Sequence, residues 1–245
     1  MLGYSTTPGG QVPWGARWSR ERDCHTGPMT TIADVKTEVD RVFDASGAPY
    51  WPNPHADNSI AAEEEYSRVT DPQKYHVLVL RLQAWQTVLA KMCDVDVDTR
   101  AKGLGTLRQR WSSPHSDTLP LYVSVVTLDQ VPFVGLSVTS DTDPFDIVPD
   151  CACDACDYGS QDLLRVLDAD LTAVVDGSLV VVTGPVVDGD PTFHLVGTGR
   201  GCAVIWGEDE VGPLFEPEAV IDAIRSGDDP LLPPGCTVRH GRSWL

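Results

Sequence analysis

The chain has 245 residues, of which 42% are hydrophobic and 22% are charged, and its formal net charge at pH 7 is -18. A chain of this length and composition can bury a globular core without disulfide staples. So large a negative charge disfavours binding to phosphate backbones and to anionic lipid headgroups. We therefore expect no nucleic acid and no membrane as partners, and a protein with a basic surface as the suitable one.

The seven cysteines indicate the redox compartment. Their number is odd and their spacing uneven, unlike the even framework of a small secreted disulfide scaffold. The first residues lack the apolar segment of a signal peptide, and no apolar run approaches the length that crosses a bilayer. These features predict a cytoplasmic protein whose cysteines are reduced or bound to metal.

The N-terminal part divides into a tail and the start of a domain. Residues 1–28 are rich in Gly, Pro, Ser, Thr and Arg without periodicity, which predicts a disordered tail. A single domain is expected over residues 29–245. Thr31 can cap its first helix, with Asp34 three residues on as in a capping box.

A second helical region is predicted in two parts, separated at Asp71-Pro72, with an apolar stripe from Leu78 to Met92. The alternating acids Asp94, Asp96 and Asp98 follow it. They lack the glycine and the later glutamate of a calcium-binding EF-hand, so we interpret them as a solvated acidic loop.

From Leu119 the pattern changes to the period of two that is typical of strands. Strands are predicted at residues 121–126, 133–138, 179–183, 192–196 and 203–206, and helices at 160–177 and 216–226. Asp129-Gln130 is expected to form a hairpin turn, and Trp244 and Leu245 to dock the C-terminal tail. The predicted helices come first in the chain, and strands mixed with helices follow. This order predicts an α+β fold, with N-terminal helices packed on a mainly antiparallel sheet and one or two further helices.

A cluster of thiols stands between these elements. Cys151, Cys153 and Cys156 lie within six residues, interleaved with three aspartates. The spacing of Cys153 and Cys156 is that of a zinc-chelating pair, and Cys151 can supply a third thiolate. A structural zinc site would then take a fourth ligand from elsewhere, and the candidates are Cys202, His194, Cys236 and His240.

Two other interpretations of the cluster remain open. In the first, Cys153 and Cys156 are redox-active or catalytic, which needs nearby cations to lower a thiol pKa. The neighbouring aspartates oppose that, and no Lys or Arg lies close in the sequence. In the second, the segment is a rigid turn whose thiols stay protonated.

The run Pro149-Asp-Cys-Ala-Cys-Asp-Ala-Cys-Asp157, followed by Gly159-Ser160 and by Leu163-Leu164 in a helix, resembles an uncharacterised family. Its members are small acidic actinobacterial proteins, a domain of unknown function with a PDCxCDxCD motif. The end of the chain, from His240 to Leu245, is similar to theirs too, and the resemblance covers residues 29–245. It implies a bacterial cytoplasmic setting and no assigned activity.

No catalytic signature is found elsewhere in the sequence: the nucleophile elbow, the His-Glu-x2-His zinc motif and the Walker phosphate loop are all missing. We therefore predict a non-catalytic binding or structural protein with no catalytic residues, whose thiol cluster holds a structural zinc ion or forms a rigid turn. The alternative is a thiol- or zinc-dependent enzyme that uses Cys153 and Cys156.

Overall fold

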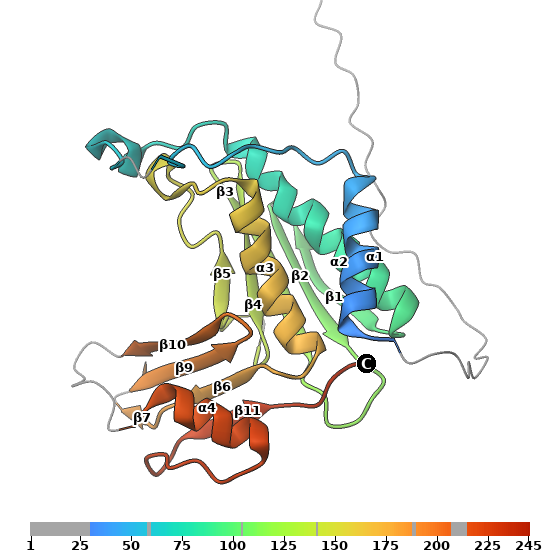
Figure 1. The fold of residues 1–245 in the computed structure, drawn as a ribbon, viewed down its shortest axis with the longest axis vertical. Coiled ribbons are helices and arrows are strands. Elements are labelled where there is room, and N and C mark those ends of the chain that lie inside the picture. The colour runs from blue at the N-terminus through green and yellow to red at the C-terminus, as the bar shows by residue number, and fades with distance from the viewer. Residues whose placement is uncertain (1–29, 58–59, 104, 141, 188–189, 207–214) are drawn as a thin grey trace, which may run out of the picture.

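The computed structural model describes residues 30–57, 60–103, 105–140, 142–187, 190–206 and 215–245. The tail expected at residues 1–28 lies outside these ranges. The described elements confirm the α+β fold, with mainly antiparallel sheets (Figure 1). The α-helices are α1 (Ile32–Asp44), α2 (Val77–Met92), α3 (Ser160–Val175) and α4 (Pro217–Ser226). Short 3-10 turns are η1 (Glu63–Ser67), η2 (Pro72–His76) and η3 (Asp154–Cys156).

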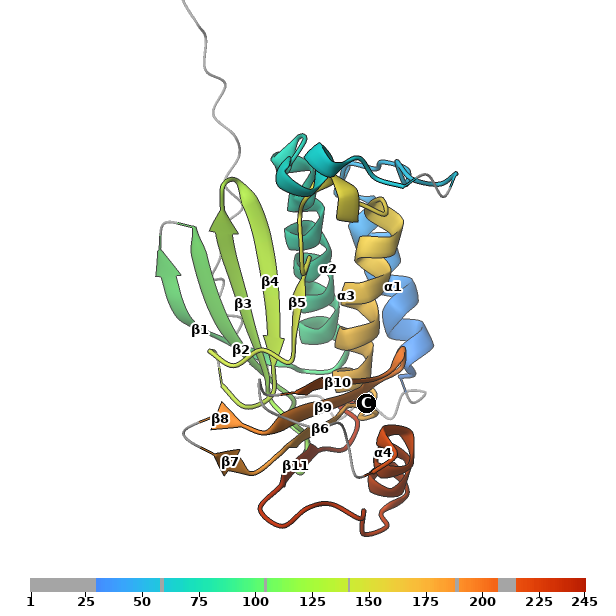
Figure 2. The same ribbon diagram turned by 90° about the vertical axis from the view of Figure 1, so that its left-hand side faces the viewer.

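The larger sheet follows the order of the sequence and is antiparallel throughout. Its strands are β1 (Asp96–Gly103), β2 (Thr106–Ser112), β3 (Leu121–Leu128), β4 (Val131–Ser137) and β5 (Asp146–Val148). Helices α1, α2 and α3 lie side by side on one face of this sheet (Figures 1 and 2). As predicted, α1 begins with a capping box in which Thr31 and Asp34 exchange hydrogen bonds.

The second sheet has the order β10-β9-β6-β11. Its strands are β6 (Val180–Thr183), β9 (Phe193–Thr198), β10 (Gly201–Trp206) and β11 (Thr237–His240), and a ribbon of β7 (Val186–Val187) and β8 (Asp190–Pro191) stands beside it. Side chains of β6 alternate between two cores: Val181 joins the core of the helical layer, whereas Val180 and Val182 pack with α4 residues. Both faces of β6 are therefore covered, which accounts for its uninterrupted apolar sequence.

The C-terminal tail docks as expected. Trp244 is completely buried, and its indole N–H donates to the Leu119 carbonyl at 3.1 Å. Its backbone N–H donates to the carbonyl of Val175, the last residue of α3, at 2.8 Å. Trp244 therefore fixes the end of the chain against the helical layer.

Three predictions about local structure are wrong. The acids after Cys93 do not form a loop, because Asp96 opens β1 and both Asp96 and Asp98 lie exposed on this edge strand. The first part of the second helical region is only the 3-10 turn η1. Helix α3 is capped by Gly159, whose φ of +87° favours glycine, while the predicted cap Ser160 is the first helical residue.

No helix among the described residues combines the length and the apolar character needed to span a membrane.

A buried cation joins the three helices of the main layer. Arg81 of α2 is 5% exposed and bonds Asp168 of α3 through Nε at 2.8 Å and Nη2 at 2.7 Å. It also bonds Asp40 of α1 at 2.6 Å, and the Trp85 indole N–H donates to Asp168 at 2.7 Å. The guanidinium therefore compensates a carboxylate that the packing of α2 against α3 removes from water.

Replacing Arg81 by Met leaves Asp168 without its cation in a largely dry site. The free energy of unfolding should fall by about 3–5 kcal/mol, the usual cost of breaking a buried pair on one side. Chemical denaturation followed by circular dichroism measures the change. Arg41→Met is the matched control, since Arg41 bonds Glu38 on the exposed face of α1 and its loss should hardly matter. Equal effects of the two substitutions would contradict the structural role of Arg81.

A second cation links the two sheets. Arg200, in the turn between β9 and β10, bonds Asp146 of β5 at 2.7 Å and Asp170 of α3 at 2.8 Å. Asp170 is completely buried. Burial, followed by a hydrogen bond with Asp146, raises the pKa of Asp170 to about 8 against the opposing effect of Arg200. Asp170 therefore keeps its proton at neutral pH.

This raised pKa predicts a pH dependence of stability. Between the unfolded value of 3.8 and the folded value of about 8, the folded protein binds a proton that the unfolded chain has lost. The stabilisation is therefore complete below pH 4 and is lost as the pH rises through about 8. In Asp170→Asn, which cannot titrate, the free energy of unfolding should fall less steeply from about pH 5 to about pH 9. Denaturant midpoints across that range measure it, with the partly exposed Asp162→Asn as control; parallel curves for wild type and Asp170→Asn would refute the raised pKa of Asp170.

Candidate metal centre

The three clustered cysteines meet in one short loop. This thiol loop, residues 150–157, connects β5 to α3 and contains the single 3-10 turn η3. The Sγ atoms of Cys151, Cys153 and Cys156 all lie within 4.8 Å of one another. Because Zn–S bonds are about 2.3 Å long, three sulfurs on a tetrahedral zinc ion lie about 3.8 Å apart. A small contraction of the loop would thus bring all three thiols to bonding distance of one ion.

The thiols polarise one another. Burial raises the pKa of Cys153, but hydrogen bonds from the other two thiols and from the backbone N–H groups of Ala155 and Cys156 outweigh it, so that this pKa lies below its usual range. The hydrogen bond to Cys153, followed by burial, raises the pKa of Cys156 to about 12. The cluster therefore favours a thiolate on Cys153 over one on Cys156. Cys153 is buried, and Cys151 is exposed.

A second segment packs along the loop. We call residues 50–57 and 60–76 the strap; they lie in the connection between α1 and α2 and include η1 and η2. Asp154 of the loop is the first anchor: it accepts from Arg68 Nε at 2.6 Å, from the Thr70 N–H at 2.6 Å and from the Thr70 hydroxyl at 2.7 Å. Burial opposes its ionisation, but the bonds from Arg68 and Thr70 hold the pKa of Asp154 at about 2.

Asp157 is the second anchor and is nearly buried. Lys74 Nζ lies 2.6 Å from its carboxylate, and the Trp51 indole N–H donates to it at 2.9 Å. Lys74 also lies over the rings of Trp51 and Tyr75, at 5.4 and 5.3 Å from their centroids. This pair of charges is therefore enclosed by aromatic rings, where a Coulomb attraction is stronger than in water.

These contacts correct the electrostatic prediction. The sequence suggested that the aspartates leave the thiols in an unrelieved negative field, yet Arg68 and Lys74 pair with two of them from 86 and 83 residues away. Accordingly, the raised pKa of Cys156 comes from the neighbouring thiols and from burial rather than from acids. The three sulfurs, rather than the paired aspartates, are therefore the groups that can bind a cation at this loop.

The suggested fourth ligands lie elsewhere. His194, Cys202 and His240 belong to β9, β10 and β11 of the second sheet, and Cys236 precedes β11. His240 Nδ1 lies 3.1 Å from the Leu179 carbonyl. Within the described ranges, none of the four joins the group of ligand atoms around Cys153, which contains the three thiols of the loop alone.

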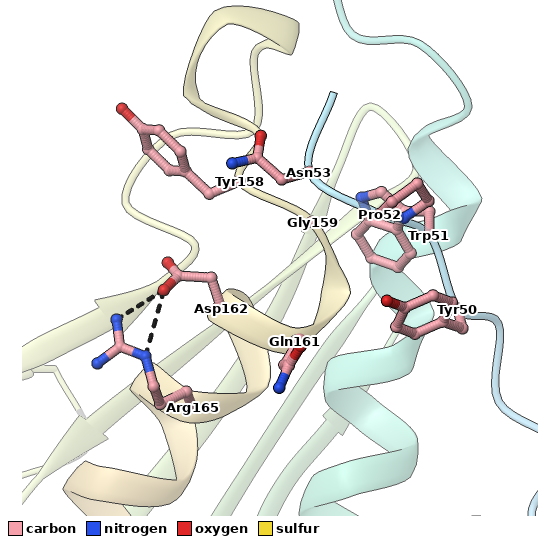
Figure 3. Close-up of a pocket in the computed structure, with 9 residues that line it drawn as sticks. All are labelled: Tyr50, Trp51, Pro52, Asn53, Tyr158, Gly159, Gln161, Asp162 and Arg165. Carbon is pink, nitrogen blue, oxygen red and sulfur yellow. Dashed lines mark hydrogen bonds and ion pairs between the residues drawn. The ribbon is translucent and has the colours of Figure 1, made fainter. Parts of the chain in front are cut away.

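A cleft of about 250 Å³ opens beside the loop (Figure 3). One wall consists of strap residues Tyr50 to Asn53, and the other of Tyr158 and the first turns of α3. Tyr50 and Tyr158 are exposed aromatic side chains on opposite walls, and Arg165 is paired with Asp162 at 2.6 Å. The cleft therefore combines three aromatic side chains with two amide side chains and an ion pair.

Sequence reasoning found the thiols but missed the strap. Residues such as Trp51, Arg68 and Lys74 have no motif that connects them to a loop more than 80 residues away. The single local signal was the pair of aspartates directly after Cys153 and Cys156, which needed partners once the loop was partly buried.

Comparisons with known proteins give a family without an activity. Searches of the curated proteins and of the solved structures found no match. One family model matches residues 39–217, a span that includes the strap, the thiol loop and the cleft. This chain belongs to that family, which is described as a family of unknown function, DUF6226.

Proposed function

We propose that the chain is a non-catalytic binding protein whose thiol loop holds one zinc ion. The observation that carries the proposal is the convergence of three Sγ atoms within 4.8 Å. Soft thiolate ligands select zinc and other thiophilic ions rather than calcium or magnesium. A fourth position is open to water or to a donor from a partner, because the described residues offer three ligands.

The charges around the loop support this assignment. Zinc with three thiolates carries one net negative charge, and Arg68 and Lys74 lie close by on the flanking aspartates. The lowered pKa of Cys153 means that the first thiolate forms readily, and the metal promotes loss of the remaining protons.

The free cysteines and the net charge support the proposed cellular location and the proposed partner. The six cysteines within the described residues form no disulfide, which supports a reducing, cytoplasmic location. A net charge of -18 supports a protein partner with a basic surface rather than nucleic acid or membrane.

The rival function is that of a thiol-dependent enzyme. Its specific support is the lowered pKa of Cys153, the property of a nucleophile. Cys153 is only 7% exposed, however, and a nucleophile has to meet its substrate. Zinc bound to all three sulfurs uses the same thiolate without that requirement.

Elemental analysis of the purified protein should find about one zinc ion per chain. Cys153→Ser should lose that zinc and destabilise the fold by several kcal/mol, because ligation is coupled to folding. Cys202→Ser is the matched control and should keep the metal. A loss of only about 1 kcal/mol in Cys153→Ser, with no zinc in the wild type, would indicate a rigid turn of protonated thiols.

Alkylation separates zinc binding from the enzymatic rival. Iodoacetamide at neutral pH, followed by peptide mass spectrometry, reports the reactivity of each thiol. We expect Cys151 to react in the metal-free protein because it is exposed, and zinc to protect all three cysteines. Rapid modification of Cys153 in the presence of zinc would favour the enzyme.

A further inference from the structure

The strap is bound to the thiol loop through the residues next to the thiols. Asp154 directly follows Cys153, and Asp157 directly follows Cys156. The backbone adds to these side-chain contacts: the Asp154 N–H donates to the Arg68 carbonyl at 2.8 Å, and His55 Nε2 lies 3.1 Å from the Asp154 carbonyl. Any shift of the two cysteine backbones therefore moves both anchors of the strap.

Two further contacts continue the interface on either side. The Tyr75 hydroxyl donates to the Ala152 carbonyl at 3.1 Å, between two of the cysteines. At the start of α3, the Ser160 N–H donates to the Trp51 carbonyl at 3.1 Å, and the Trp51 N–H donates to Ser160 Oγ at 3.2 Å. A Cβ atom on Gly159 would lie 2.6 Å from the Asn53 nitrogen, so the two backbones are in direct contact there.

Zinc would act on this interface through the loop. Bringing the sulfurs from the present separations of up to 4.8 Å to about 3.8 Å fixes the backbone between Cys151 and Cys156. Without the ion, hydrogen bonds alone restrain this backbone, among them the Cys156 N–H to the Cys153 carbonyl at 3.1 Å, the Cys153 N–H to Cys151 Sγ at 3.4 Å and the Tyr75 hydroxyl to the Ala152 carbonyl. The anchors are therefore held more rigidly in the metal-bound loop.

We propose that the thiol loop is a metal-controlled clasp for the strap: zinc on Cys151, Cys153 and Cys156 strengthens the binding of Asp154 and Asp157 to the strap. This inference rests on the proposed zinc site and adds its regulatory role. Loss of zinc loosens the strap without unfolding the cores, since the strap contributes few residues to them.

The cleft is what the clasp controls. Trp51, Pro52 and Asn53 form its strap wall, and the opposite wall begins one residue after Asp157. In Figure 3, Tyr50 and Trp51 stand across the opening from Tyr158 and Asp162. A strap held by zinc keeps these walls at a fixed separation, whereas a loosened strap changes the shape of the cleft.

Thermodynamic linkage gives the clasp two independent readouts. If zinc raises the equilibrium constant for docking of the strap by some factor, then docking of the strap raises the affinity for zinc by the same factor. Zinc should therefore protect strap amides, and a strap with fewer bonds to the loop should bind zinc more weakly although every thiol is intact.

The first measurement is hydrogen exchange of the full chain with and without zinc. The reporter amides are Thr70, which donates to Asp154 Oδ1, and Trp51, which donates to Ser160 Oγ. We expect zinc to slow their exchange about tenfold, within the usual range of coupling between sites. Amides in the middle of α2 are the internal reference and should not change.

The second measurement is zinc affinity by competition with a chromophoric chelator. The variant Trp51→Phe/Thr70→Val removes one side-chain bond from each anchor and leaves the thiols untouched. We expect its affinity for zinc to fall at least about fivefold. Thr37→Val, on the exposed face of α1, is the matched control, and the single Thr70→Val variant serves if the double variant does not fold.

The outcomes separate the two proposals. Absence of zinc binding overturns both the zinc site and the clasp. Binding of one zinc ion with unchanged exchange at Thr70 and Trp51, or with unchanged affinity in the strap variant, overturns the clasp and leaves the zinc site standing. Protection of the strap together with weakened zinc binding supports the clasp.

Discussion

The hydrogen bonds from the strap to Asp154 and Asp157 are the contacts on which the site depends. Each carboxylate is held by a cation and by a second donor, so the loop between β5 and α3 has one defined shape. That shape brings three thiols together and fixes the opening of the adjacent cleft. The three thiols, the strap and the cleft therefore belong to one interface rather than to three separate features.

Pairing of a carboxylate with a nearby cation also stabilises the interior of this acidic protein. The chain has 36 acidic and 18 basic residues, so one-to-one pairing would leave half of the carboxylates without a basic partner. Among the described residues, the partly buried Asp168 is paired with Arg81, and the buried Asp157 with Lys74. Asp170 has to share Arg200 with Asp146, and it retains a proton instead. Scarce cations thus lie where elements meet, between helices or between the two sheets.

The family model covers the whole of this interface. It matches residues 39–217, which contain all of the strap, the thiol loop and the first turns of α3. Strand β11 and most of α4 lie beyond it. The match thus spans part of α1, all of α2 and α3, the larger sheet and strands β6 to β10 of the second half of the chain.

Local patterns were sufficient to predict α1 with its capping box, the hairpin of β3 and β4 around Asp129-Gln130, and the docking of Trp244. Each depends on residues close in sequence or on one conspicuous side chain. Strand β1 escaped prediction because an edge of a sheet tolerates charges that hide the alternation. The sequence alone also determined the cluster of three cysteines, since six residues of chain cannot separate them far. Only the tertiary structure decided which groups surround them, because the partners of Asp154 and Asp157 come from a segment more than 80 residues away, and pairing over such distances follows from the packing of whole elements.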